Sequence, residues 1–188
     1  MAEPQPQRMT IEEFLDWQLK QEKLYELVDG LPLLPLKMMT GATHNHDTIV
    51  VNALTILRGQ LRGERCRPKS QDIGVRIPKG NIRRPDVLVD CGSPRGTDMV
   101  AADPRVVIEV LSPSTTNFDR FKKLPEYMTV PSLAAILLVN TEAPHVTVYR
   151  RSGAEWIDED VKGLASEINR LGIEATLPMA ELYDGVQF

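Results

Sequence analysis

The 188-residue chain is 42% hydrophobic and 26% charged, which is typical of a folded globular protein and argues against global disorder. Its formal net charge of −4 does not indicate a nucleic-acid-binding protein. It does not exclude one either, because a local basic surface acts within a Debye length of about 8–10 Å whatever the total charge. We expect a single domain over residues 10–188, after a flexible N-terminus at residues 1–9.

The sequence favours a cytoplasmic protein with no membrane partner. Its first residues, MAEPQPQR, lack the apolar segment of a secretory signal. No apolar run approaches the roughly 18 residues of a transmembrane helix. Cys66 and Cys91 stand apart from any C-x-x-C or metal-ligand spacing, so we predict two buried, reduced thiols.

Helices and strands are predicted to alternate along the chain. In chain order we expect a helix over residues 10–19, a hairpin of strands 24–28 and 31–38, a helix over 43–62, strands 73–77, 84–90 and 106–111, a helix over 118–128, strands 135–140, 146–150 and 155–157, and a closing helix over 177–182. Residues 65–70 are basic and loop-like. This order predicts an α/β architecture around a mixed sheet.

Several residues mark the ends of the first elements. Thr10 and Glu13 fit the capping box that begins a helix. Asp29-Gly30 is a strong hairpin turn. Pro32 and Pro35 place the returning strand at the edge of its sheet, because proline cannot donate to a neighbouring strand.

Glu109 is the residue that points to chemistry, because it lies inside the apolar segment V-V-I-E-V-L at residues 106–111. Such a segment is typical of a strand covered on both faces, where an unpartnered ionised carboxylate costs several kcal/mol. Upstream, residues 84–90 carry Asp86 at the entry to a second apolar strand. If these strands pair, Asp86 and Glu109 converge, and their oxygens suit one hard divalent cation such as magnesium.

A positive charge is expected from the segment that follows Glu109. Asp119, Lys123 and Tyr127 are spaced i, i+4 and i+8, which places them on one face of a helix. From there Lys123 would orient a water and neutralise charge on a phosphate in the transition state. Pro125 requires that this helix begins later than residue 118 or bends near Lys123.

The motifs of the chain occur in a recognisable order: Y-E-L-V-D-G at residues 25–30, His46 at a helix start, Pro85-Asp86, E-V-L-S-P-S-T at residues 109–115, and Asp119 with Lys123 and Tyr127. This order resembles the Uma-type putative restriction endonuclease family, within the PD-(D/E)XK nuclease superfamily, over most of the chain. The resemblance implies a restriction-endonuclease-like core, in which helices flank a mixed central β-sheet, with an N-terminal helix and β-hairpin.

The resemblance also implies a metal site for Mg²⁺, with Mn²⁺ as a substitute. Asp86, Glu109 and the backbone carbonyl of Val110 would hold the ion. The chain departs from the superfamily pattern at Leu111, where the E-x-K motif has its lysine. We therefore expect Lys123 to take the role of that lysine.

Two further residues are candidate catalytic groups. In much of the superfamily an acid from the N-terminal region joins the site, and Glu26 is the candidate here. Its place before a hairpin turn also fits an outward-facing strand residue. His46 would contact phosphate or act near the metal, although a histidine at a helix start is also typical of capping or packing. Tyr127 fits a core residue as well as a site residue.

Each of these predictions has a structural alternative. Lys123, beside Lys122, could belong to a solvated helix face. Asp86 and Glu109 could instead form ion pairs within the fold, with Arg76, Arg83, Arg84 or Arg105 as partners. Basic residues in two regions could follow a phosphate backbone: Arg58, Arg62, Arg65, Arg67 and Lys69 in the first, and Arg83-Arg84 in the second.

Together these features predict a magnesium-dependent endonuclease that hydrolyses phosphodiester bonds of nucleic acid, with DNA as the expected substrate. A homodimer is expected by analogy, because two sites cut both strands of a duplex most simply. The alternative is a catalytically inactive module that keeps the nuclease fold for binding or assembly. Leu111 and the acidic net charge favour that alternative.

Overall fold

The computed structural model of the protein describes residues 8–35, 42–111 and 122–188. Its elements, in chain order, are α1 (Ile11–Gln18), β1 (Glu26–Val28), β2 (Leu31–Leu33), α3 (His44–Gln60), β3 (Arg67–Ser70), β4 (Val75–Ile77), β5 (Asn81–Arg83), β6 (Val87–Asp90), β7 (Pro104–Leu111), α5 (Leu124–Met128), β8 (Ala135–Asn140), β9 (His145–Ser152), β10 (Glu155–Lys162), β11 (Glu167–Ile168), β12 (Leu177–Pro178) and α6 (Met179–Leu182).

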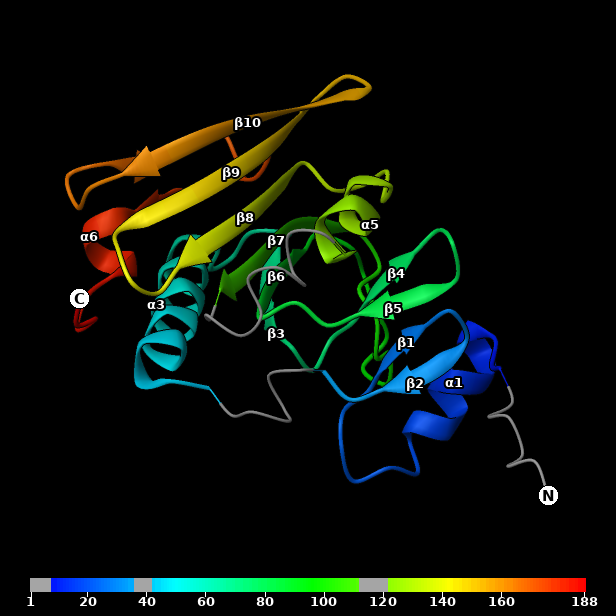
Figure 1. The fold of residues 1–188 in the computed structure, drawn as a ribbon. Helices are drawn as coiled ribbons and strands as arrows, with labels where there is room; N and C mark the ends of the chain where they lie inside the picture. Colours follow the sequence, from blue (N-terminus) through cyan, green and yellow to red (C-terminus); the bar gives the residue numbers. More distant parts are fainter. Residues whose placement is uncertain (1–7, 36–41, 112–121) are drawn as a thin grey trace.

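Two main sheets lie beside each other (Figure 1). The larger has the strand order β10-β9-β8-β7-β6-β3, and the smaller has the order β2-β1-β5-β4. In the larger sheet β7 and β8 are parallel, while the other neighbouring strands are antiparallel. The predicted α/β architecture with a mixed central sheet is therefore confirmed, and so is the edge position of β2.

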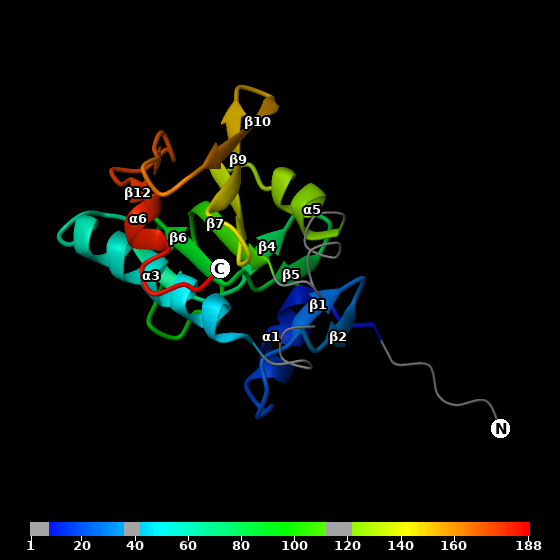
Figure 2. The same ribbon diagram turned by 60° about the vertical axis from the view of Figure 1, so that its left-hand side comes forward.

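Helices cover both faces of the larger sheet, as Figure 2 shows for α3 and α6 on one side and α5 on the other. Successive side chains of a strand point to opposite faces. On β7, Ile108 and Val110 accordingly pack in the core that includes α3 and α6, while Val107 and Leu111 pack in the core that includes α5. Glu109 shares the second orientation and faces α5.

The N-terminal helix and hairpin form as predicted, for local reasons. The Thr10 side chain accepts a hydrogen bond from the Glu13 N–H, and the Glu13 carboxylate accepts one from the Thr10 N–H, so the capping box is confirmed. Asp29 and Gly30 both have positive φ, at 50° and 79°, as a tight turn between antiparallel strands requires. Residues 36–38 of the expected return strand lie outside the described residues.

The long helix α3 also forms as predicted. Thr43 is its N-cap, and the Thr43 side chain accepts a hydrogen bond from the His46 N–H. Ile49, Ala53 and Leu57 recur on its buried side, as the helical spacing of apolar residues indicated. Within the described ranges, no helix combines the length and the apolar character that crossing a lipid bilayer demands.

The prediction of a loop at residues 65–70 is wrong, because Arg67–Ser70 is the strand β3. It pairs antiparallel with β6, and Ser70 lies opposite Val87. Its basic and proline-containing sequence has little strand propensity, so the partner strand and partial burial decide the conformation. The strand expected over residues 155–157 is also longer, because β10 pairs with β9 along its whole length.

The prediction of two reduced thiols is wrong as well, because Cys66 and Cys91 form a disulfide. Cys66 directly precedes β3 and Cys91 directly follows β6. Arg67 pairs with Asp90 across these strands, so the cysteines are the next residues of the same register. The strand pairing brings them together across a sequence separation of 25 residues.

Candidate functional site

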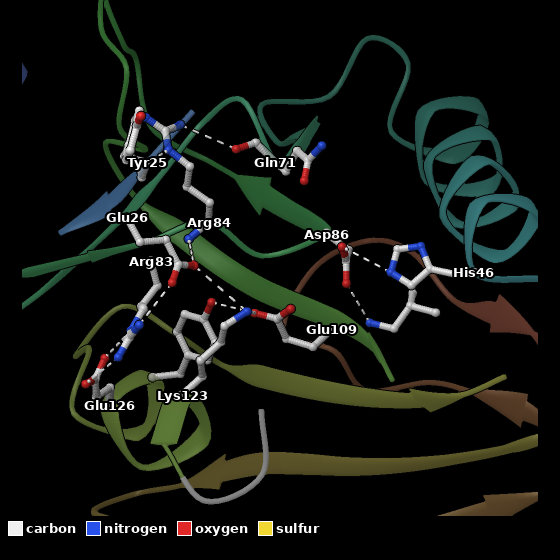
Figure 3. Close-up of polar contacts among 12 residues, drawn as sticks. Tyr25, Glu26, His46, Gln71, Arg83, Arg84, Asp86, Glu109, Lys123 and Glu126 are labelled. Carbon is white, nitrogen blue, oxygen red and sulfur yellow. Dashed lines mark hydrogen bonds and ion pairs between the residues drawn. The ribbon is translucent and has the colours of Figure 1, made fainter. Parts of the chain in front are cut away.

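Asp86 lies at the end of the β6–β7 pair, beside the residue that follows Glu109. Val87 pairs with Ile108, and continuing that register by one residue brings Asp86 opposite Glu109. The Val110 N–H donates a hydrogen bond of 2.8 Å to Asp86 Oδ2. The register therefore places the two acids at neighbouring positions of paired strands, where Asp86 contacts His46 from α3 and Glu109 contacts Lys123 from the α5 side (Figure 3).

His46 reaches Asp86 from α3. Its Nε2 lies 3.4 Å from Asp86 Oδ1, and both side chains are buried. The backbone N–H of His46 meanwhile completes the cap of α3. His46 therefore takes part in the cap of α3 and also faces the Asp86 carboxylate (Figure 3). Its role in catalysis stays a prediction.

The buried charge of Glu109 is compensated by two hydrogen-bond donors on the α5 side of the sheet, the side that Glu109 faces. Tyr127 Oη donates a 2.7 Å hydrogen bond to Glu109 Oε1, and Lys123 Nζ donates one of 3.1 Å to the same oxygen. The carboxylate is 1% exposed, so these contacts offset a desolvation cost of several kcal/mol.

Lys123 lies just before α5, and the alternative of a solvated helix face is wrong for it. Lys123 is 4% exposed, whereas Lys122 is exposed. Residues 122–123 form a π-type turn, and Pro125 lies in the first turn of α5, where its missing N–H breaks no helical hydrogen bond. Residues 118–121 of the expected helix, with Asp119, lie outside the described residues.

Glu26 is buried at 2% exposure, so the alternative of an outward-facing strand residue is wrong. Arg83 Nη1 donates to its Oε2 at 3.0 Å, and the Arg84 N–H donates to its Oε1 at 2.9 Å. Lys123 Nζ lies 3.9 Å from that same Oε1. Burial alone would raise the pKa of Glu26, but the positive charges of Lys123 and Arg83, together with the hydrogen bonds from Arg84 and Arg83, hold this pKa below its usual value.

Arg83, named from the sequence as a possible partner of Asp86 or Glu109, pairs instead with Glu126, a neighbour that the sequence did not reveal. Arg83 Nε donates to Glu126 Oε2 at 2.6 Å and Nη2 donates to Oε1 at 3.0 Å, a bidentate pair. Asn81 Nδ2 also donates to Glu126 Oε1, at 3.0 Å. Burial by itself would lower the pKa of Arg83, but the contacts with Glu126 and Glu26 raise it. Nothing in the sequence near Glu126 indicated a partner more than forty residues away.

Tyr127 is both a core residue and a hydrogen-bond donor to the site. Its ring is fully buried in the core that includes α5. Burial, and next the negative charges of Glu109 and Glu26, raise its pKa well above the usual value. The hydroxyl therefore keeps its proton at neutral pH and donates it to the hydrogen bond with Glu109.

The other arginines named as possible partners form ion pairs of their own. Arg76 contacts Glu12 at 3.0 Å, and Arg105 contacts Asp103 at 4.0 Å. In the first basic region Arg67 donates to the carbonyl of Leu61, the C-cap of α3, at 3.3 Å, so it helps hold the chain at the end of that helix. Binding of a phosphate backbone by these regions stays a prediction.

A cavity of about 170 Å³ adjoins the predicted site on the side of α3. Asp86 and His46 line it together with Ala42, Asp47, Val50, Ser70 and Gln71. Ser70 ends β3, so the strand that the sequence missed supplies one wall. This space is where a small group would reach Asp86.

The residues present suit a magnesium ion by the chemistry of their donors. Asp86, Glu109 and the Val110 carbonyl offer only oxygen, which hard divalent cations prefer. Over the described ranges, no three His, Cys, Asp or Glu side chains are grouped as metal ligands. Two carboxylates nevertheless match Mg²⁺, which keeps several waters and takes the remaining contacts from substrate phosphates.

Comparison with known proteins decides the family. The Uma2 family, described as "Putative restriction endonuclease", matches residues 11–180. The chain belongs to this family. Two Synechocystis sp. proteins, the uncharacterized proteins slr1290 and sll1609, are 31% and 27% identical to it, over 80% and 85% of this chain and 78% and 91% of theirs.

The fold of this Uma2 member is also found in a solved structure. The crystal structure of "a putative nuclease belonging to DUF820" from Anabaena variabilis matches with a TM-score of 0.71 at 16% identity, over 95% of this chain and 99% of that one. The restriction-endonuclease-like fold is confirmed. In this Uma2 chain, Leu111 fills the E-x-K lysine position and packs in the core with α5, while Lys123 contacts Glu109 from the start of α5.

Proposed function

We propose that this protein is a metal-dependent nuclease that hydrolyses phosphodiester bonds of nucleic acid, with DNA as its substrate. One observation carries the proposal most strongly. Lys123, a buried lysine from outside the E-x-K motif, lies 3.1 Å from Glu109, and Asp86 binds the peptide N–H next to that acid. An ammonium beside one acid, and a second acid beside the next peptide group, support the proposal on a nuclease fold.

Asp86, Glu109 and the Val110 carbonyl would hold the ion. A divalent metal, when bound there, supplies Lewis-acid stabilisation of phosphoryl charge and activation of water as a nucleophile. Other side chains of the protein hold the two proposed ligand carboxylates in position. His46 orients the Asp86 carboxylate, and Tyr127 holds Glu109 through Oε1. Such outer contacts typically change metal affinity or activity by about 10–100-fold when they are removed.

Lys123 would act beside Glu109. Its ammonium, which lies beside Glu109 and Glu26, would donate a hydrogen bond to the attacking water and neutralise charge that develops on the phosphate. A buried ammonium does this more effectively than an exposed one, because water does not screen it.

Plasmid cleavage with Mg²⁺ tests the proposal. The wild-type protein should cut, and Asp86→Ala and Glu109→Ala should each lower the rate by on the order of 10²–10³-fold or more, the loss typical for a residue that stabilises the transition state directly. Glu12→Ala, which removes an exposed acid from α1, is the control and should cut normally. Equal cleavage by all four proteins would remove both acids from the mechanism, and RNA of matched sequence tests the choice of DNA.

A catalytically inactive nuclease-fold module for binding or assembly is the second candidate. Leu111 in place of the motif lysine and the net charge of −4 favour it. Calorimetric titration with Mg²⁺ or Mn²⁺ separates the two candidates. Absence of binding heat, together with no retardation of DNA at low salt, would favour assembly by an inactive module.

The proposed function also carries the expectation of a homodimer, because two sites cut both strands of a duplex most simply. Sedimentation equilibrium measures this directly. A dimer mass is expected, while a monomer that cuts both strands would separate activity from assembly.

A further inference from the structure

Lys123 lies between two buried carboxylates that come from different sheets. Its Nζ is 3.1 Å from Glu109 Oε1, on β7 of the larger sheet, and 3.9 Å from Glu26 Oε1, on β1 of the smaller sheet. All three residues are at most 4% exposed. A buried ammonium with one acid as its sole counter-charge would be drawn fully to that acid, whereas two acids hold it at a defined point between them.

Donors other than Lys123 hold the Glu26 carboxylate in place. Its Oε2 accepts from Arg83, and its Oε1 accepts from the Arg84 N–H. These donors belong to β5 and the residue after it, and β5 pairs with β1 through Leu27 and Ile82. The backbone of the smaller sheet therefore sets the position of the carboxylate, and both of its oxygens are already engaged by donors.

Arg83 extends the same arrangement to the segment that carries Lys123. It is bidentate to Glu126 on α5, three residues after Lys123, and it also binds Glu26. One guanidinium thus ties the acid beside the ammonium to the helix that follows the lysine. Figure 3 shows Glu26, Arg83 and Glu126 gathered on the Lys123 side of the site, with Asp86 and His46 on the other side of Glu109.

We propose that Glu26 is a positioning residue that holds Lys123 beside Glu109, and that Glu26 is not a metal ligand. The inference rests on the proposed function, because it assigns a role within the same site. It replaces the expectation that Glu26 joins the site as a further acid. It also gives the smaller sheet a function, which is to set the position of the lysine that the E-x-K motif lacks.

A double-mutant comparison tests the inference. The variants are Glu26→Gln, which keeps the shape and removes the charge, Lys123→Met, and the two together. Glu26→Gln should lower kcat for DNA cleavage by about 10–100-fold, with KM and calorimetric Mn²⁺ affinity changed less than about twofold. In the Lys123→Met background the same change should have no further effect on kcat, because Glu26 acts through the lysine.

Three results would overturn the inference. The first is a tenfold or greater loss of Mn²⁺ affinity in Glu26→Gln, as expected for Asp86→Asn, since that indicates a ligand. The second is a multiplicative loss of kcat in the double variant. The third is an unchanged kcat in Glu26→Gln. Glu12→Gln makes the same chemical change at an exposed acid and should alter none of these quantities.

Glu26→Asp keeps the comparison decisive if Glu26→Gln does not fold. It retains the charge but withdraws it from Lys123 by one methylene, so kcat should fall while Mn²⁺ affinity stays constant. A fall in Mn²⁺ affinity in this variant would again indicate a ligand.

Failure of the proposed function is distinguishable from failure of this inference. If the wild-type protein cuts no nucleic acid, the same three variants are compared by urea unfolding. A positioning contact predicts that the double variant changes the unfolding equilibrium constant by less than the product of the single changes, by about twofold or more. A simple product would contradict the contact itself.

Discussion

Two groups of ion pairs in this protein have similar contact distances but differ in how far they are exposed to solvent. The buried charge cluster consists of Glu26, Arg83, Glu109 and Lys123, which are buried, together with Glu126, whose side chain is 21% exposed. The hairpin ion pairs lie on β9 and β10, where His145 contacts Asp160 at 2.8 Å and Arg150 contacts Glu159 at 2.5 Å. Contact distances are alike, but the Glu109 side chain is 1% exposed and the Glu159 side chain is 50% exposed.

This difference indicates what each group is for. Exposed pairs contribute about 0–1 kcal/mol, since water already solvates their charges. A buried pair is often no more stabilising than an apolar pair of the same volume, because desolvation offsets the attraction. Removal of one partner nevertheless lowers the stability of the fold strongly, because the other charge stays buried and uncompensated. The protein therefore gains little stability from keeping these charged groups together away from solvent. Their retention supports a functional role for the cluster.

The largest effect on stability is expected from Arg83→Met. This change removes the guanidinium that compensates Glu26 and Glu126. The buried Glu26 carboxylate and the partly buried Glu126 carboxylate then lose this positive charge. The free energy of unfolding should fall by about 3–5 kcal/mol, as measured by urea denaturation. A loss below about 1 kcal/mol would show that the buried charge cluster behaves like an exposed one.

Tyr127→Phe is expected to have a smaller effect. The phenylalanine keeps the ring in the core and removes only the hydrogen bond to Glu109. A hydrogen bond to a charged group is worth about 1.5–3 kcal/mol, so urea denaturation should show a loss in that range. The half-buried Tyr25→Phe serves as the control. If both variants lose the same amount, the contact with Glu109 has no special weight.

Lowering the pH should have the next largest effect, and it should destabilise the buried charge cluster more than the hairpin ion pairs. The pKa of Glu26 is lowered in the folded protein, so the unfolded chain takes up this proton first as the pH falls. The stability that Glu26 contributes is therefore complete above its ordinary pKa of 4.5 and is lost as the pH drops through the lower folded value. Glu26→Gln should flatten the dependence of unfolding free energy on pH below about 4.5.

Asp160 is the exposed counterpart in that experiment. Hydrogen bonds from His145 and then Thr147 lower its pKa as well, so the sign is the same. Asp160→Asn should nevertheless change the acid limb much less than Glu26→Gln does, because solvent screens the exposed contacts. Equal changes in the two variants would contradict the contrast between the groups.

The smallest effect is expected from Glu159→Gln on β10. Its partner Arg170 has a side chain that is 77% exposed, and its partner Arg150 still donates to the Asn169 carbonyl without it. The unfolding free energy should change by no more than about 1 kcal/mol, and added salt should reduce even that difference. A salt-independent loss above about 2 kcal/mol would show that this surface pair behaves like a buried one.

Local signals predicted much of the fold. The capping box at Thr10, the Asp29-Gly30 turn and the apolar spacing of α3 are each decided within a few residues. The strand β3 and the disulfide at Cys66 depend instead on which strand pairs with which, and a single sequence does not carry that information. Their sequences gave no periodicity or cysteine spacing to follow.

The candidate site divides in the same way. Asp86 and Glu109 stood out as acids within apolar strands, and Lys123 followed from the missing lysine at Leu111. The pairing of Arg83 with Glu126 did not follow, because it joins β5 to α5 across a fold that has to be known first. Sequence therefore finds charged residues whose burial is locally evident, while their more distant partners require coordinates.

Anomalous scattering from a crystal soaked in Mn²⁺ tests the central claim most directly, because it locates the ion without relying on activity. The account predicts one peak in contact with the carboxylates of both Asp86 and Glu109, with Lys123 beside it and Glu26 outside the coordination sphere. A peak bound by Glu26, a peak elsewhere, or no peak between Asp86 and Glu109 would contradict it.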